Sequence, residues 1–434
     1  MIKAGYLFSC CAIAVSFGFA SAQVTADNIS VVATEGETIP QTGDTITMVL
    51  GAAVNDMGQV VFRANTSRAA GHRGLFTRDK MVIAYEGDAI GTTGISFTQI
   101  QTNAAINNSG QIVFRGLAPA QGSYPGHVGI FRGDGTFVAN RDIPVGAVGR
   151  EVNFISGVPG ISDTGAIAFH AIDSNPPGSS DGEGIFLDDG SAVVLDRDTA
   201  ADTGVSIRSV IQDFPLSISS SGEVAFAGPI TPGNDGNDGI FSSTGGVIST
   251  LALKGDLAGT TGRTFTSFQR FPAINNNGDV AYVASTTPDA DGNEMGIFDR
   301  SGEPIVLEGD PAADLGVVFQ EFINTGRGGD GQWPDVLIND VGQVAFRAIT
   351  SRLPGPGRID RGLFLANPDG TIIKIVFEGE TLANSFGVED AINDVWFAPD
   401  GLSDNFLVFG VSFFNGTDAL FITDISDTIC TCAL

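Results

Sequence analysis

Residues 271–310 read FPAINNNGDVAYVASTTPDADGNEMGIFDRSGEPIVLEGD, and this stretch decides the fold. It holds short apolar segments at 271–275, 279–284, 296–298 and 304–307, separated by Asn-Asn-Gly, by a Gly/Asp-rich loop and by Ser-Gly. Alternation at period two is typical of strands, and Asn and Gly tolerate the positive φ of tight hairpin turns. The stretch therefore predicts a four-stranded antiparallel meander.

The same pattern recurs along the chain. The triplet Gly-Ile/Leu-Phe returns at spacings of 55, 55, 55, 57, 66 and 57 residues, starting at Gly74, Gly129, Gly184, Gly239, Gly296 and Gly362, with Ala419 in a seventh copy. A second signature, Ile-Asn-x-x-Gly-x-Val-x-Phe, precedes each triplet, with its Asn position at Asn55, Asn107, Ser162, Ser219, Asn275 and Asn339, and a loose seventh copy within 398–409. A fixed period of this length is typical of repeat architectures.

Seven four-stranded units predict an all-β fold, a seven-bladed β-propeller of four-stranded antiparallel blades, because one such unit cannot bury both of its faces alone. The last unit ends on its third strand, 419–422, whereas 29–37 (ISVVATEGE) matches the fourth strand of other units. We therefore expect the N-terminal strand to complete the last blade and close the ring, which would remove free sheet edges.

The Asn-x-x-Gly-x-Val-Ala-Phe signature resembles the bacterial exported proteins with tandem NxxGxxAF repeats and a variable C-terminal anchor. The resemblance covers nearly the whole chain after the N-terminal segment, and it implies export without implying any shared activity. Residues 424–434 contain no sorting motif, apolar helix or basic stop, so anchoring by that route is not expected.

The ends of the chain predict processing and location. Lys3, an apolar run over 6–19 and Ala-Ser-Ala at 20–22 are typical of a secretory signal peptide, so we expect residues 1–22 to be removed. Residues 23–425 would form the propeller domain and 426–434 a tail with Cys430-x-Cys432. The mature protein would be secreted or periplasmic, with no integral membrane segment.

The net charge bears on possible partners, and the cysteine content bears on how the chain is stabilised. A net charge of −28 argues against nucleic acid, which requires a basic face. Only Cys430 and Cys432 would remain after processing, so packing and not a disulfide framework must stabilise so long a chain.

Two acidic groups invite a metal hypothesis. Carboxylates recur in the turn after each fourth strand, where backbone capping is the structural alternative to a cation ring. One oxygen-rich loop, PDADGNE, offers Asp289, Asp291, Asn293 and Glu294 as Ca²⁺ ligands, although it lacks the full EF-hand pattern and could equally be a solvated turn.

Arginine-bearing loops and one insertion are the candidate ligand-binding residues. Equivalent loops of the first and sixth repeats carry Arg68, Arg73, Arg352 and Arg358, whose guanidinium groups suit anionic ligands or pair with neighbouring acids. The insertion within 324–335 adds Arg327, Asp330, Gln332 and Trp333, a combination suited to a sugar or small ligand, or to a plug over the channel.

Catalysis has little support in the sequence. The three histidines, His72, His127 and His170, show no metal-ligand spacing, and no catalytic residue is assigned. The leading hypothesis is a non-catalytic binding or scaffold module that presents a propeller face to a polysaccharide or protein. The alternative is a propeller hydrolase or lyase acting on a polysaccharide or lactone, with or without Ca²⁺.

Overall fold

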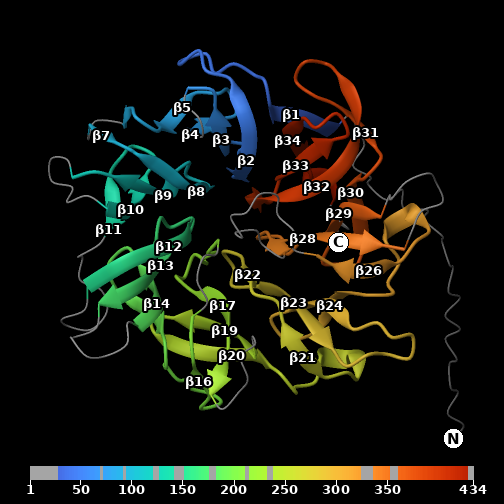
Figure 1. Ribbon diagram of the computed structural model, residues 1–434. Helices are drawn as coiled ribbons and strands as arrows, with labels where there is room; N and C mark the ends of the chain where they lie inside the picture. Colours follow the sequence, from blue (N-terminus) through green and yellow to red (C-terminus); the bar gives the residue numbers. More distant parts are fainter. Residues whose placement is uncertain are drawn as a thin grey trace, which may run out of the picture.

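The computed structural model describes residues 28–68, 72–90, 94–120, 127–140, 151–174, 182–210, 215–231, 238–323, 336–351 and 360–428. These residues form an all-β fold in which antiparallel sheets succeed one another around a common centre, a β-propeller-like arrangement (Figure 1). Short 3₁₀ turns occur at η2 (Gly259–Thr261), η3 (Ala313–Leu315) and η4 (Ser426–Thr428). Within the described ranges no helix is long and apolar enough to cross a membrane.

The first three repeats each form a four-stranded meander, as predicted. Their strands are β2 (Ile46–Val54), β3 (Val60–Thr66), β4 (Arg73–Thr77) and β5 (Val82–Tyr85); β8 (Gln99–Ile106), β9 (Ile112–Ala118), β10 (His127–Arg132) and β11 (Phe137–Asn140); β12 (Glu151–Ile161), β13 (Ile167–Ser174), β14 (Gly182–Leu187) and β15 (Ala192–Leu195). A small ribbon of β6 (Ala89–Ile90) and β7 (Ile95–Ser96) joins the first to the second.

The later repeats are less regular, because their inner strand is broken or shortened. The fourth has β17 (Val224–Gly228), β19 (Gly239–Thr244) and β20 (Val247–Leu253), with β16 (Ser206–Ile207) and β18 (Ile230–Thr231) as a separate pair. The fifth and sixth have five strands each: β21 (Phe265–Phe268), β22 (Ala273–Ile274), β23 (Val280–Thr286), β24 (Met295–Asp299) and β25 (Pro304–Leu307); β26 (Phe319–Phe322), β27 (Val336–Ile338), β28 (Val344–Thr350), β29 (Arg361–Ala366) and β30 (Ile372–Phe377).

The last sheet contains both ends of the described chain. It is built from β31 (Thr381–Ala383), β32 (Glu389–Leu402), β33 (Phe406–Phe413), β34 (Asp418–Asp424) and β1 (Ile29–Thr34). The predicted pairing of the N-terminal strand is observed, since β1 runs antiparallel to β34 from Ile29 opposite Thr423 to Thr34 opposite Ala419. The inner strands β2 and β32 also touch, in parallel, at Ala53 and Asp400.

The core lies between neighbouring sheets and is centred on repeated aromatic pairs. In every repeat the last aromatic of the Asn-x-x-Gly signature lies beside the phenylalanine of the Gly-Ile/Leu-Phe triplet, with ring centroids 5.6–6.1 Å apart. Aromatic pairs at this separation add to the stabilisation that burial gives. This pairing explains why phenylalanine so outnumbers tyrosine in the sequence.

The triplet glycines are required by space. A Cβ on Gly74, Gly184, Gly239, Gly296 or Gly362 would lie 2.3–2.9 Å from side-chain atoms, either of the phenylalanine two residues later or of the fourth-strand residue opposite. The residues opposite are Tyr85, Leu195, Leu253, Leu307 and Phe377. In the seventh copy Ala419 replaces glycine, and it faces the smaller Thr34.

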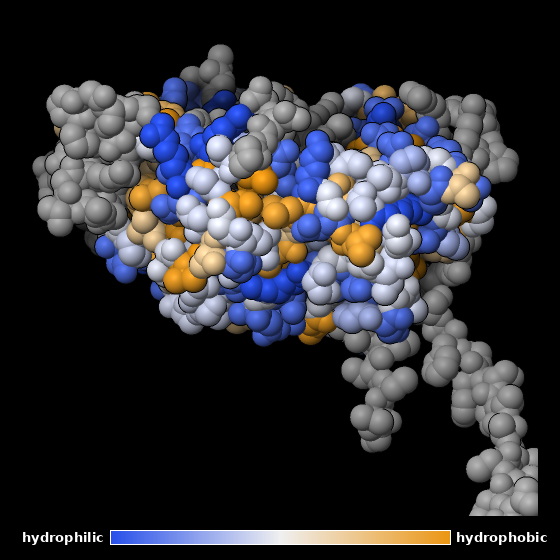
Figure 2. All heavy atoms as spheres, turned by 90° about the horizontal axis from the view of Figure 1, so that it is seen from below, coloured by the Kyte–Doolittle hydropathy of each residue, from blue (hydrophilic) through white to orange (hydrophobic). Residues whose placement is uncertain are grey.

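The exterior is mixed in character. Figure 2 views the molecule edge-on, and on this side apolar residues form small groups separated by hydrophilic ones. Scattered exposed apolar residues are normal for a protein surface and do not by themselves mark a binding site.

Candidate functional site

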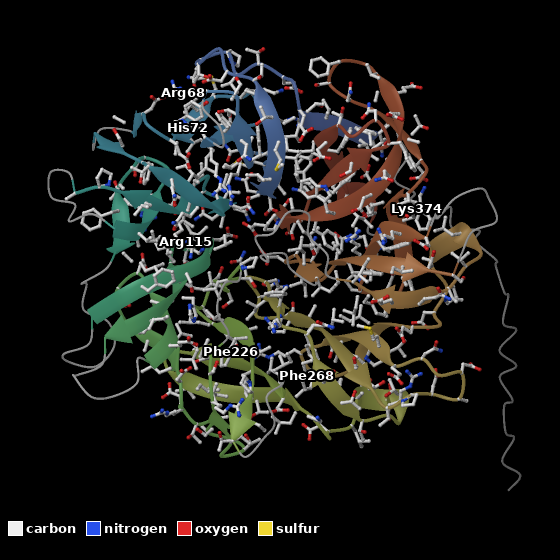
Figure 3. The ribbon with its side chains drawn as sticks, in the orientation of Figure 1. Arg68, His72, Arg115, Phe226, Phe268 and Lys374 are labelled. Atoms are coloured by element: carbon white, nitrogen blue, oxygen red, sulfur yellow. The ribbon has the colours of Figure 1, made fainter. Side chains whose placement is uncertain are left out.

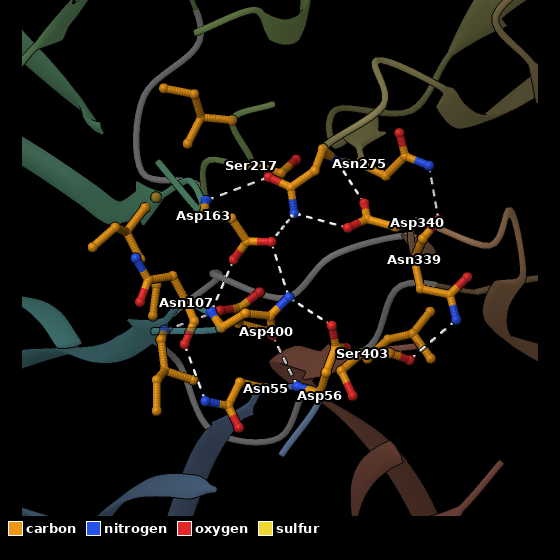
Figure 4. A pocket seen from close by; sticks show the side chains of 18 of the residues that line it. Asn55, Asp56, Asn107, Asp163, Ser217, Asn275, Asn339, Asp340, Asp400 and Ser403 are labelled. Carbon is orange, nitrogen blue, oxygen red and sulfur yellow. Dashed lines mark hydrogen bonds between the residues drawn. The ribbon is translucent and has the colours of Figure 1, made fainter. Parts of the chain in front are cut away.

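The turns of the Asn-x-x-Gly signature gather at one end of the central axis, where they line a pocket of about 110 Å³ (Figure 4). Each of these turns is closed by its own signature asparagine or serine. Asn55 Oδ1 accepts the backbone N–H of Met57 and Gln59, and Gly58 has the positive φ (+70°) predicted for the hairpin. The turn chemistry predicted from the sequence is thus confirmed.

The same asparagines also tie one repeat to the next. Asn55 Nδ2 donates to the carbonyl oxygen of Asn107, 3.0 Å away, and Asn107 Nδ2 donates to that of Ser162 at 3.0 Å. Asn275 and Asn339 make the equivalent bonds to the turns that follow them. These side chains are buried, so the bonds are shielded from water and the asparagine is a connector as well as a turn residue.

The residue after each signature asparagine completes a cycle of hydrogen bonds around the mouth. In each link a backbone N–H donates to the side-chain oxygen Oδ1 of the next member, at 2.7–3.4 Å, in the order Asp56, Asn108, Asp163, Asn276, Asp340, Asp404 and back to Asp56. The fourth repeat is bypassed, and its Ser220 instead donates its hydroxyl to Asn276. We call these six residues the axial ring.

The axial ring is electrostatically uneven. Asn108 donates from Nδ2 to the carboxylates of both Asp56 and Asp163, and Asn276 does the same for Asp163 and Asp340. Asp404 has a carboxylate neighbour on each side, and burial followed by the charges of Asp56 and Asp340 raises the pKa of Asp404. One side of the ring thus alternates amide with carboxylate, and the other concentrates negative charge.

Asp400 lies beneath the axial ring, between this pocket and a deeper one of about 80 Å³ lined mainly by apolar residues such as Leu216 and Phe271. The Asp400 side chain is half-buried. Burial raises the pKa of Asp400 to about 6, helped by the negative charge of Asp163, while the hydrogen bond from the Ile106 N–H opposes the shift.

This shift predicts a pH effect on stability. Because the pKa of Asp400 is higher in the folded than in the unfolded chain, ionised Asp400 destabilises the fold above pH 6, and the penalty disappears as the pH falls toward 4. Asp400→Asn should therefore raise the free energy of unfolding by about 1–2 kcal/mol at pH 7, a value reduced for partial solvation, and leave it unchanged at pH 4. Urea unfolding at both pH values measures this; an equal gain at both would contradict it.

Arg68, one of the predicted anion-binding arginines, makes structural contacts within the first sheet. Arg68 Nη1 lies 2.8 Å from Asp88 Oδ2, its Nε lies 3.5 Å from Asp44 Oδ2, and its guanidinium lies 4.4 Å from the centre of the Tyr85 ring. Figure 3 places Arg68 and His72 toward the outer rim and Arg115 nearer the centre. Arg73 opens β4, and its backbone N–H donates to Glu86. Arg68 is thus held by its acidic neighbours, the structural alternative of the prediction.

The other predicted ligand-binding residues lie outside the described part of the chain. These are Arg327, Asp330, Gln332, Trp333, Arg352 and Arg358, together with the signal peptide 1–22 and the tail cysteines Cys430 and Cys432. Their roles stay predictions.

The predicted Ca²⁺ loop is a self-capped turn. Asp289 Oδ1 accepts the backbone N–H groups of Asp291 and Asn293, and Asp289 Oδ2 pairs with Arg263 at 2.5 Å. Glu294 donates its N–H to Glu308. In the residues described, no three His, Cys, Asp or Glu side chains are placed to share a metal ion. The contacts of Asp289 therefore match the solvated-turn alternative.

The carboxylates after the fourth strands also cap their own turns. Glu37, Asp198, Asp256, Asp310 and Glu380 each accept the N–H of the residue three positions earlier. The arginines after the core phenylalanine bridge sheets: Arg63 and Arg115 donate to carbonyls of the following inner strand, and Arg347 pairs with Asp394 of β32 at 2.5 Å. The turn carboxylates thus match the backbone-capping alternative, and these arginines join neighbouring sheets.

Sequence reasoning missed a groove on the same end of the molecule as the axial ring. It has a volume of about 570 Å³ and lies between the fifth and sixth sheets, lined by the turns that follow β22, β24, β27 and β29. Its size falls within the range of 300–1,000 Å³ that ligand pockets occupy. The one hint in the sequence is Asp279, which stands where the first, second and fourth repeats have the longer Gln59, Gln111 and Glu223.

Comparison with known proteins places the chain in a family. A model of a family of unknown function, DUF7453, matches residues 79–381, which is more than half of the chain. The chain belongs to this family. Membership in DUF7453 leaves the predicted resemblance to exported NxxGxxAF-repeat proteins as a prediction. A search of curated proteins gave no match.

Solved structures similar to this DUF7453 member include one described as a propeller, an arabinanase and a polysaccharide lyase. "Structure of Dos1 propeller" shares 11% identity and covers 91% of this chain and 95% of its own, with a TM-score of 0.40. An α-L-arabinanase of Penicillium chrysogenum bound to arabinobiose shares 9% and covers 93% and 99%, with a TM-score of 0.30. The polysaccharide lyase Uly1 shares 11% and covers 91% and 90%, with a TM-score of 0.32. Likeness this distant says nothing about what the DUF7453 chain binds.

Proposed function

We propose that this protein is a secreted, non-catalytic binding or scaffold module, built as a closed seven-bladed β-propeller, that presents the end bearing the Asn-x-x-Gly turns to an extracellular polysaccharide or protein. The observation that carries the proposal is the use of the axial oxygens. Each member of the axial ring accepts a backbone N–H of a neighbouring turn, so these groups connect the sheets.

Three observations support closure with seven blades. The sequence contains seven copies of the triplet, β1 of the N-terminal segment pairs with β34 of the last copy, and Asp404 donates to Asp56 at 2.8 Å. Closure would remove exposed sheet edges, which otherwise invite aggregation. Secretion rests on the signal-peptide pattern of residues 1–22.

The rival proposal is a hydrolase or lyase at the axial mouth. One observation favours it: Asp400 and Asp163 are neighbouring carboxyl groups in different environments, an arrangement that acid–base enzymes use. The size of the pocket opposes it. A volume of about 110 Å³ is well below the roughly 300 Å³ at which ligand pockets begin, so a sugar ring does not fit without rearrangement.

A binding screen with recovery of the ligand tests the proposal. The biotinylated protein, residues 23–434, would be applied to a glycan array and to a panel of purified extracellular proteins. We expect saturable binding of at least one ligand, recovered at unchanged mass. Release of shortened or unsaturated products that is lost in Asp400→Asn would instead establish the enzyme.

A further inference from the structure

The groove between the fifth and sixth sheets has walls of two kinds. Ile305, Pro368 and Val341 provide apolar surface, and the Val341 side chain is exposed. The carboxylate of Asp279, just before β23, and that of Asp299, at the end of β24, also line the groove. The two sheets lie side by side in the yellow and orange part of Figure 1.

A short side chain, Asp279, stands at one edge of the groove. At three other junctions the residue four positions after the signature Asn or Ser reaches the turn glycine of the next repeat. Gln59 approaches Gly110 and Gln111 approaches Gly165, each with Oε1 3.0 Å from where a Cβ would lie, and Glu223 approaches Gly278 at 3.3 Å. Asp279 is one methylene shorter, and no atom of it lies within 4 Å of that position at Gly342.

The groove carries uncompensated negative charge. Asp279 uses Oδ2 to accept from Asn275, and Asp299 uses Oδ1 to cap its own turn, so within the described residues the second oxygen of each has no hydrogen bond. Arg300 also lines the groove, but it pairs with Glu223 at 2.6 Å and donates to the carbonyl of Gly278. Arg300 therefore leaves the charges of Asp279 and Asp299 unbalanced.

A partner for these walls needs a cation on an apolar stem. Lysine and arginine meet this need, because their methylene chains pack on apolar surface while the charged head reaches a carboxylate. The lining of the groove comes from four turns of two sheets, a succession of contacts that an extended peptide can follow. Neutral sugars would leave the free carboxylate oxygens without a charge partner, and anionic glycans would be repelled.

We propose that this groove binds an extended, lysine- or arginine-bearing segment of a partner protein. The inference rests on the proposed binding function and specifies its partner. Asp279 and Asp299 receive the cationic heads, and Val341, Pro368 and Ile305 support the stems.

The test uses a fluorescein-labelled octapeptide of alternating lysine and valine, titrated by anisotropy with the protein comprising residues 23–434. Asp279→Asn removes the charge at constant size, and we expect it to weaken binding about threefold to fivefold, as for an exposed charge pair. Asp279→Glu keeps the charge but adds the methylene with which Gln59, Gln111 and Glu223 reach the turn glycine of the next repeat. We expect a loss of about tenfold or more, because the longer side chain would occupy the groove. The peptide with glutamate in place of lysine should not bind.

Asp189→Asn is the matched control, because Asp189 lies in an outer turn of the third sheet and its loss changes the net charge equally. It should bind within twofold of the unaltered protein, and melting curves should show all variants folded. Equal binding by Asp279→Glu and the unaltered protein would overturn the groove assignment, since the attraction would then be general to an acidic surface. The glycan and protein screen is independent of these variants. A ligand from that screen that binds Asp279→Glu and the unaltered protein equally would refute the groove alone. Absence of a ligand in both experiments would refute the binding function as well.

Discussion

Removal of residues 1–36 is expected to lower the free energy of unfolding by about 5 kcal/mol, the largest effect of any change considered. The deletion takes away β1, including the fully buried Val32 and Ala33, and leaves the edge of β34 unpaired. The estimate combines the burial of these apolar side chains with about five strand hydrogen bonds at roughly 0.5–1.5 kcal/mol each. The deletion also removes Thr34, whose hydroxyl oxygen accepts a hydrogen bond from the backbone N–H of Ser385. Urea unfolding followed by tryptophan fluorescence measures the change, because Trp396 is buried in the same sheet.

A protein that begins at Asn28 is the control, since it retains every described residue and should unfold like the longer chain. A synthetic peptide of residues 28–36 should restore part of the lost stability in proportion to its concentration, because a strand that binds only the folded state stabilises it. Unchanged unfolding of the shortened protein would show that β1 does not hold the last sheet, and would remove the main support for ring closure.

Substitution of Gly296 by alanine is expected to cost about 3 kcal/mol of stability. The new Cβ would lie 2.6 Å from Leu307 Cδ2 and 2.9 Å from the Phe298 ring, closer than carbon atoms approach without displacement. Overpacking of a filled core costs about 1–3 kcal/mol, and the upper end applies here because two neighbours are affected. The reverse substitution, Ala419→Gly, should cost only about 1 kcal/mol, the backbone entropy of a strand glycine.

A double-mutant cycle identifies the cause. The seventh repeat shows that alanine is tolerated when the residue opposite is threonine, as Ala419 and Thr34 demonstrate. Leu307→Thr should therefore rescue part of the loss in Gly296→Ala, giving a favourable coupling of about 1 kcal/mol between neighbouring sites. Additive effects would assign the loss to the strand backbone and not to the contact with Leu307.

Much of the architecture could be predicted from the repeat. The meander of the fifth repeat was predicted at 279–284 and 304–307, and β23 and β25 occupy these places. The prediction for the inner strand, 271–275, is only partly correct. The strand β22 there is two residues long and pairs with the start of β23, whereas β21, earlier in the chain, pairs with the end of β23. Local alternation and turn residues specify hairpins well, but the extent of an inner strand depends on the neighbouring repeats that it packs against.

The candidate site was harder to predict, because its contacts join residues far apart in sequence. Arg68 suggested an anion site, yet Asp44, just before β2, and Tyr85 of β5 hold it. Asp289 suggested a Ca²⁺ ligand, yet Arg263 and its own turn use its oxygens. In so acidic a chain, the sequence shows which side chains are charged and not which of them already have a partner.

The repeat exemplified by residues 271–310 determined by itself the strand pattern, the hairpin turns and the pairing of 29–34 with the last copy. These features depend on period-two alternation and on residues that tolerate positive φ. The tertiary structure alone decided that the residues after the signature asparagines meet in one axial ring, and that a groove lies beside Asp279 between the fifth and sixth sheets. Both depend on distances between separate repeats, which are set when the sheets pack around the axis.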